Sequence, residues 1–164
     1  DPYHSSLNFT IMHSGISMIN GKFTNYTGSL TTDGDNIENA QFDFSIQTKS
    51  INTNVDPRDN HLRSADFFDA EKYPTMTLKS TKIIKTGKPN QYVLHGKLTI
   101  KDVTKDVVFD LVLGGISKSD KGDKIGFKAT TLINRFDYNI NYDPGALGIG
   151  KDVQIEVHLQ FANQ

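Results

Sequence analysis

One stretch of the 164-residue chain spaces its apolar residues as a helix does, and it reads Arg58-Asp59-Asn60-His61-Leu62-Arg63-Ser64-Ala65-Asp66-Phe67-Phe68-Asp69-Ala70-Glu71-Lys72-Tyr73-Pro74-Thr75. Its apolar side chains, roughly one helical turn apart, are Leu62, Ala65, Phe67 and Phe68. Asp56 followed by Pro57 is typical of a helix start with Asp56 as N-cap, and Pro74 stops the helix. The pattern predicts one short helix over about residues 58–70.

The rest of the chain alternates apolar and polar residues, which is typical of strands with one buried face. The alternation predicts about eight strands, near residues 7–13, 18–31, 41–48, 76–81, 92–100, 107–113, 125–131 and 153–161. In the long second strand, Gly21 and Gly28 indicate a bulge or a corner. Short connections indicate antiparallel pairing. No linker or repeat divides the sequence, so we expect one domain over residues 1–164.

A single helix among antiparallel strands favours a β-barrel that the helix plugs or covers at one end. An eight-stranded barrel either fills its interior with side chains or holds one small ligand, and both cases give the same alternation. The residues alone favour a filled core, in which inward-facing phenylalanines pack against each other.

Composition excludes several classes of function. The net charge is −1, with 18 Lys and Arg against 19 Asp and Glu, so no field attracts nucleic acid or an anionic membrane. No apolar run approaches the roughly 18 residues of a membrane span. Cysteine is absent, which excludes disulfides, thiolate catalysis, Cys-type zinc sites and attached c-type haem.

Motifs of catalysis and metal binding are also missing from the sequence. There is no His-x-His, His-Glu-x-x-His or Gly-x-Ser-x-Gly pattern. The glycine-rich run Gly145–Gly150 precedes a strand rather than a helix, so it is a loop at the barrel mouth and not a phosphate-binding loop. We therefore expect no enzyme, no metal site and no required cofactor.

Several motifs occur in order along almost the whole chain: His4-Ser5-Ser6-Leu7-Asn8-Phe9 with His13, Gly21-Lys22-Phe23 leading to Gly28, Asn52-Thr53-Asn54, Arg58–Leu62, Asp66–Asp69, Lys72-Tyr73-Pro74, Gly96–Ile100 with Val103–Lys105, and Asn134-Arg135. With these motifs the chain resembles the YceI-like family, polyisoprenoid-binding proteins with a lipocalin-like barrel. The family usually continues after the last motif with Asp-Phe-Gly, whereas this chain has Tyr138 in place of the Phe and Asn139 in place of the Gly. The departure concerns the local turn rather than the fold.

The resemblance implies an all-β fold, an eight-stranded antiparallel lipocalin-like barrel with the short helix capping one end. It also implies an apolar cavity for a long-chain amphiphile: an isoprenoid, an isoprenoid quinone, or a fatty acid or amide. The expected ligand-binding residues are Phe9, Ile11, His13, Phe23, Phe42, Phe44, His61, Phe67, Phe68, Leu78, Leu98, Phe109, Leu111, Phe127 and Val157. Such proteins are mostly periplasmic or secreted, and a homodimer is compatible with the sequence.

Two functions stay open at this point. The first is a carrier or store of the amphiphile; if His13 and His61 meet at the mouth, they hydrogen-bond its head group rather than transfer a proton. The second is an enzyme acting on such a lipid, with His13, His61 or a carboxylate at the mouth as acid or base. Arg58 and Asp59 are expected to be structural, as a cap or as an ion pair that holds the helix to a strand.

Overall fold

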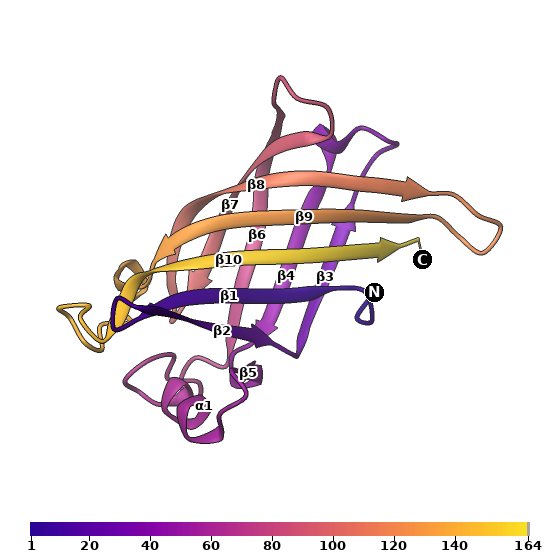
Figure 1. Cartoon of the computed structure of the whole chain (residues 1–164). Coiled ribbons are helices and arrows are strands. Elements are labelled where there is room, and N and C mark those ends of the chain that lie inside the picture. Colours follow the sequence, from indigo (N-terminus) through magenta and orange to yellow (C-terminus); the bar gives the residue numbers. More distant parts are fainter. Residues whose placement is uncertain (164) are drawn as a thin grey trace.

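The computed structural model describes residues 1–163, and its strands form one curled antiparallel sheet (Figure 1). The strands are β1 (Ser6–His13), β2 (Ser17–Phe23), β3 (Tyr26–Thr31), β4 (Gln41–Gln47), β5 (Ile51–Asn52), β6 (Thr75–Lys85), β7 (Gln91–Ile100), β8 (Val103–Ser117), β9 (Lys124–Asn134) and β10 (Ile149–Ala162). The helices are α1 (Asp56–Arg63) and the 3-10 helices η1 (Ile37–Asn39), η2 (Thr48–Ser50) and η3 (Arg135–Tyr138).

The ten strands follow the order β3-β4-β6-β7-β8-β9-β10-β1-β2-β5, which makes the fold a half-barrel with β3 and β5 at its edges. The all-β antiparallel class is therefore confirmed, but the expected count of eight strands is wrong. Residues 18–31 are not one bent strand, because β2 pairs with β1 whereas β3 pairs with β4. The chain leaves one part of the sheet for the other at Thr24 and Asn25, and the short β5 was not predicted.

Gly21 and Gly28 are not bulges, and each lies opposite a phenylalanine of the neighbouring strand. Gly21 pairs with Phe9, and Gly28 pairs with Phe44. A Cβ atom at Gly21 would lie 2.2 Å from Phe9 Cζ, and one at Gly28 would lie 2.3 Å from Phe44 Cε1. The glycines thus leave room for two rings to lie against the sheet.

The helix covers a shorter stretch than predicted and begins earlier. Val55 is its N-cap, so the prediction of Asp56 as the cap is wrong, although Pro57 does lie in the first turn. The helix ends at Arg63, well before Pro74, and turns follow in which Asp69 has a positive φ of 47°. The apolar spacing that extended the predicted helix to residue 70 arises in these turns. Figure 1 shows α1 and β5 beneath one end of the half-barrel.

The interior of the half-barrel is only partly filled. Side chains of β4, β7 and β8 such as Phe42, Leu98 and Phe109 are buried in a common core. In contrast, inward-facing side chains of β1 and β10 such as Phe9 and Val157 are only half-buried. Both line an internal cavity, which is the surface to which they are exposed.

Candidate functional site

A cavity of about 970 Å³ occupies the inside of the half-barrel. Of the expected ligand-binding residues, those on its wall are Phe9, Ile11, His13, Phe23, Phe42, Phe44, His61, Phe67, Phe68, Leu78, Leu98, Phe109, Leu111 and Val157. Phe127 does not line it. The volume lies at the upper end of the roughly 300–1,000 Å³ typical of small-molecule sites. The wall is mostly aliphatic and aromatic, so the cavity suits an apolar ligand.

The cavity stops at a cluster of phenylalanines near the ends of β9 and β10. The Phe42 ring lies 5.2 Å from Phe127 and 5.8 Å from Phe161, both in edge-on contact. Phe44 lies 6.3 Å from Phe161. Phe42 and Phe44 face the cavity, whereas Phe127 and Phe161 pack against them and do not. The prediction for Phe127 was wrong because alternation gives the face of a strand and not the depth along it.

The opposite end, which we call the mouth, is built from α1, the turns after it, the β1–β2 hairpin and residues 139–148. The cavity reaches the surface there, since the exposed side chains of His13, His61 and Tyr142 belong to its wall. The rings of His61, Phe67 and Tyr142 contact each other with centroids about 5 Å apart, at 5.0, 5.0 and 4.9 Å. These contacts join the helix segment to the 139–148 loop across the mouth.

Arg135 organises the 139–148 loop, which we call the mouth loop. The Arg135 side chain is buried, and its guanidinium donates to the backbone carbonyls of Ile140, Tyr142, Asp143, Ile149 and Gly150 at 2.6 to 3.3 Å. Burial lowers the pKa of Arg135, and the nearby Asp143 opposes that shift. The carbonyl dipoles compensate the buried cation, and the cation in turn satisfies five backbone carbonyls at the mouth.

Asp143 completes the mouth loop from the other side. Its Oδ2 accepts from the backbone N–H groups of Gly148 at 2.7 Å and Ile149 at 2.9 Å. These two bonds lower the pKa of Asp143, with a smaller effect of the same sign from Arg135. The carboxylate is therefore committed to holding the loop and is poorly placed to act as a base.

Tyr138 lies at the departure from the family pattern and is a residue of the cavity wall. Its side chain is 1% exposed, and within residues 1–163 its hydroxyl has no hydrogen-bond partner. Burial, with a smaller effect from Asp137, raises the pKa of Tyr138 to about 12. The hydroxyl therefore stays protonated and can donate a hydrogen bond to a ligand.

The following residue explains how the departure is tolerated. Asn139 has a positive φ of 58°, in the left-handed region that glycine adopts most readily. Asparagine is among the few other residues that enter this region at low cost. Its N–H donates to the Phe136 carbonyl at 3.2 Å, so the turn is preserved with Asn in place of Gly.

His13 and His61, the two histidines considered for a shared head-group site, have separate environments. His61 Nε2 lies 2.7 Å from Asp66 Oδ2, so one ring nitrogen is engaged by a carboxylate on its own segment. His13 ends β1 on the far side of the mouth, and the structure of residues 1–163 gives no hydrogen bond to its ring. The ring contacts of His61 are with Phe67 and Tyr142, and His13 is not among them.

Arg58 and Asp59 are structural, although they form no ion pair with a strand. Both Asp59 Oδ1 contacts come from Thr53, through its backbone N–H at 2.8 Å and its hydroxyl at 2.6 Å. Arg58 donates to the Thr53 hydroxyl at 2.7 Å and to its carbonyl at 2.8 Å. The pair fixes α1 to the loop before it, while the Arg58 side chain also reaches the cavity wall.

Most residues of the cavity wall are apolar, and its polar residues are few. The polar groups of the cavity wall lie at the mouth, apart from Asn8, whose amide donates to Ser6 at 2.8 Å. Among the described residues, no three His, Asp or Glu side chains are close enough to hold a metal ion. In the same part of the chain, no helix has both the length and the apolar character to cross a membrane.

Sequence reasoning missed part of the wall, and the polar residues Arg135, Tyr138 and Tyr142 are examples. They lie outside the alternating strands, so period-two parity could not assign them a direction. Arg135 carried a signal as part of the Asn134-Arg135 motif, and Asn134 does cap η3 by accepting from the Phe136 N–H at 3.0 Å. Tyr142 carried no signal of this kind in the sequence.

Comparison with known proteins agrees with this geometry. The model of the YceI-like domain matches residues 1–161. A UPF0312 protein of Vibrio cholerae is 34% identical over 158 residues, covering 96% of this chain and 81% of the relative. The crystal structure of a Campylobacter jejuni YceI protein superposes with a TM-score of 0.85 at 32% identity, covering 91% of this chain and 87% of the other.

A more distant structure shares the fold. A polyisoprenoid binding domain from Saccharophagus degradans superposes with a TM-score of 0.74 at 18% identity, covering 98% of this chain and 94% of the other. The motifs, the half-barrel with its internal cavity and the full-length match lead to one assignment: the chain belongs to the YceI-like family.

Proposed function

We propose that this protein binds a long-chain amphiphile in the cavity and carries or stores it. The observation that supports this most is the cavity itself, about 970 Å³ in volume, with an apolar wall and polar groups gathered at the mouth. The ligand class is an isoprenoid, an isoprenoid quinone, or a fatty acid or amide. The resemblance in fold to a polyisoprenoid binding domain is consistent with this class.

In this proposal the chain of the ligand lies between β1, β10 and the facing strands, and its end approaches Phe42 and Phe44. Each buried methylene contributes roughly 0.8 kcal/mol, so about ten of them contribute roughly 8 kcal/mol before the costs of association. The head group lies at the mouth, where the Tyr138 hydroxyl can donate to a carbonyl oxygen and the His61 ring is within the same wall. Burial supplies affinity, and the hydrogen bonds select the head group.

The proposal favours binding over catalysis. Asp143 is held by two backbone N–H groups, and His61 is engaged by the exposed Asp66. Neither arrangement places a base beside a nucleophile. By family resemblance we also propose that the protein is periplasmic or secreted, which cell fractionation of the native host would test.

Native mass spectrometry of the purified protein, followed by organic extraction, tests the proposal. We expect an adduct that disappears on extraction, an extract containing an unmodified long-chain amphiphile, and recovery of the adduct when that molecule is added back. If the extracted lipid is converted on readdition, and His61→Ala abolishes the conversion, the enzyme alternative replaces this one. If no long-chain amphiphile binds the delipidated protein, the proposal is wrong.

A further inference from the structure

Part of the mouth gathers exposed apolar side chains on two neighbouring loops. We define the apolar rim as Met12, Ile16, Met18 and Leu147. Ile16 is 87% exposed and Leu147 is 83% exposed, and Met12 and Met18 are exposed as well. Residues 12–20 contain no Asp, Glu, Lys or Arg, and residues 138–150 contain only Asp143. The Asp143 carboxylate is already bonded to the backbone of its own loop.

The rim is one surface, since its two loops are joined. The Ser14 N–H donates to the Gly148 carbonyl at 2.7 Å, which places the hairpin tip beside the tip of the mouth loop. Met12 and Met18 are directly paired across β1 and β2. Met12 also lies against the mouth loop, in a shallow depression that it shares with Pro144 and Ala146.

The backbone fixes this exposure. The Ile16 N–H donates to the His13 carbonyl at 3.1 Å in a tight turn, so the Ile16 side chain has no neighbouring core to reach. Leu147 directly precedes Gly148 and Ile149, whose N–H groups donate to Asp143. The buried Arg135 holds the same loop. A single exposed apolar residue is unremarkable, but a connected and uncharged group is typical of an interaction surface.

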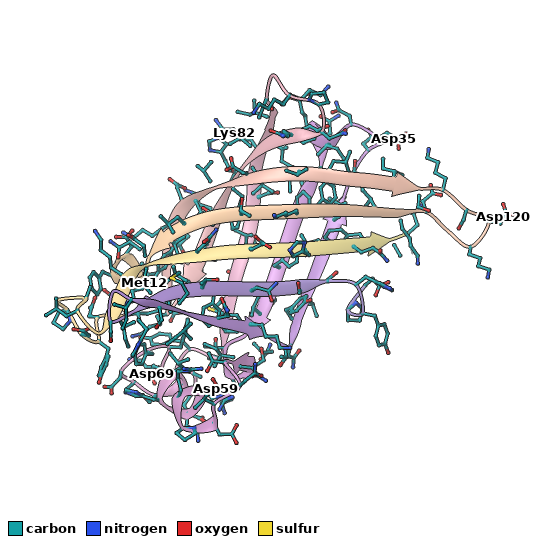
Figure 2. All side chains as sticks on the ribbon, in the orientation of Figure 1. Met12, Asp35, Asp59, Asp69, Lys82 and Asp120 are labelled. Carbon is teal, nitrogen blue, oxygen red and sulfur yellow. The ribbon has the colours of Figure 1, made fainter. Side chains whose placement is uncertain are left out.

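The rim is also continuous with the cavity. His13 and Gly148, which belong to the two rim loops, line the cavity wall. A ligand that passes from the cavity to the rim would therefore stay in contact with apolar side chains along its path. Loops at the opposite end are of different character, with Asp33 and Asp35 in one and Lys118, Asp120, Lys121 and Asp123 in another. Figure 2 shows Asp35 and Asp120 at the end of the molecule away from Met12.

We propose that the apolar rim inserts into the surface of a lipid bilayer, so that a long-chain ligand is exchanged between bilayer and cavity without crossing water. The inference rests on the proposed function, because a cavity for an insoluble chain needs an apolar source next to its mouth. A bilayer fits better than a charged partner, since the rim side chains are apolar and the charges beside them, Lys151 and Asp152, are of opposite sign. Insertion is shallow and is driven by apolar burial, which makes it independent of anionic lipid.

Flotation with phosphatidylcholine vesicles, with and without phosphatidylglycerol, tests the rim directly. We expect the wild type to float with both kinds of vesicle. The double variant I16N/L147N should lose roughly tenfold or more in partitioning, because each substitution removes an apolar side chain that the bilayer would bury. Leu132→Asn is the matched control: Leu132 is 63% exposed on the outer face of β9 and belongs to neither rim loop, so its replacement should change nothing. Both loop substitutions are at exposed tips, so melting temperatures should stay equal.

A second measurement separates this proposal from the proposed function. Delipidated protein is loaded with a fluorescent fatty acid either from vesicles or from ethanol solution. The double variant should load more slowly from vesicles and reach the same occupancy as the wild type from ethanol. Equal flotation of wild type and double variant, or binding confined to anionic vesicles, would overturn the rim proposal while leaving cavity binding intact. If instead the variant alters only self-association in size-exclusion chromatography, the rim contacts a second copy and the proposal is wrong.

Discussion

The mouth and the far end of the half-barrel bound the same cavity, but with different chemistry. At the mouth, a buried guanidinium and a carboxylate hold a loop by its backbone, and a hydroxyl and imidazoles face the interior. At the far end, Phe42, Phe44, Phe127 and Phe161 fill the space with rings. Charges there lie on outer loops, as in the 3.5 Å contact between Lys118 and Asp35. Under the proposed function, the difference assigns recognition of the polar group to the mouth and the limit on chain length to the far end.

The largest expected effect concerns the cation at each end. Arg135→Met leaves the backbone carbonyls that the guanidinium satisfied without a donor, and we expect a loss of about 3–5 kcal/mol in the free energy of unfolding. Lys118→Met removes an exposed ion pair at the far end and should cost at most about 1 kcal/mol. Urea denaturation of both variants measures the contrast. Similar losses for the two would mean that Arg135 is not the organising residue of the mouth.

The glycines opposite Phe44 and Phe9 provide a finer contrast. In Gly28→Ala the new Cβ displaces Phe44, which is buried and packed against Phe161, so we expect a stability loss of about 1–3 kcal/mol. In Gly21→Ala the displaced Phe9 is only half-buried and can turn into the cavity. That variant should keep most of its stability and bind less ligand. Thermal melts and ligand occupancy are measured on both variants. A loss of stability in Gly21→Ala with a loss of ligand binding alone in Gly28→Ala would contradict the account.

Filling the cavity from β9 should weaken ligand binding without removing any contact. Ala129 is on the wall, and Ala129→Phe places a ring in the space of the ligand chain. Displacing even two methylenes costs about 1.6 kcal/mol, which is more than tenfold in Kd. Leu132→Phe is the control, since it adds a similar ring to the outer face of the same strand. Fluorescence titration of both proteins compares them, and equal Kd values would place the ligand outside the cavity.

The smallest effect is a pH dependence confined to the mouth. Backbone N–H groups lower the pKa of Asp143, so the folded protein releases this proton more readily than the unfolded chain does. The stabilisation is complete above the ordinary aspartate pKa of about 3.9 and is lost as pH falls through the lower folded value. Ligand release should therefore accelerate in this acidic range. Stopped-flow release from Asp143→Asn should be fast already at neutral pH and should show no such acid step from this site.

Alternation predicted the strands and the inward direction of residues such as Phe9, Phe42 and Leu98, because a period of two fixes the face of every strand residue. It failed where the answer depends on a neighbour distant in sequence. Gly21 and Gly28 look like bulges until Phe9 and Phe44 are placed opposite them.

The same reasoning explains the errors at the two ends. Phe127 has the inward parity of a wall residue, but its position along β9 puts it among the far-end rings. Phe67 and Phe68 do lie on the wall, yet turns rather than a helix place them there. The mouth loop has no period at all, so its dependence on Arg135 could be found only from the folded chain.

Titration of the delipidated protein with fatty amides of increasing chain length tests the central claim most directly, that an apolar cavity with a closed far end binds one long chain. We predict that Kd falls by about fourfold for each added methylene, as expected for roughly 0.8 kcal/mol, and then stops falling once the chain reaches Phe42 and Phe44. In Ala129→Phe the plateau should come at a shorter chain. A Kd that does not depend on chain length, or a plateau that Ala129→Phe leaves unchanged, would contradict the account.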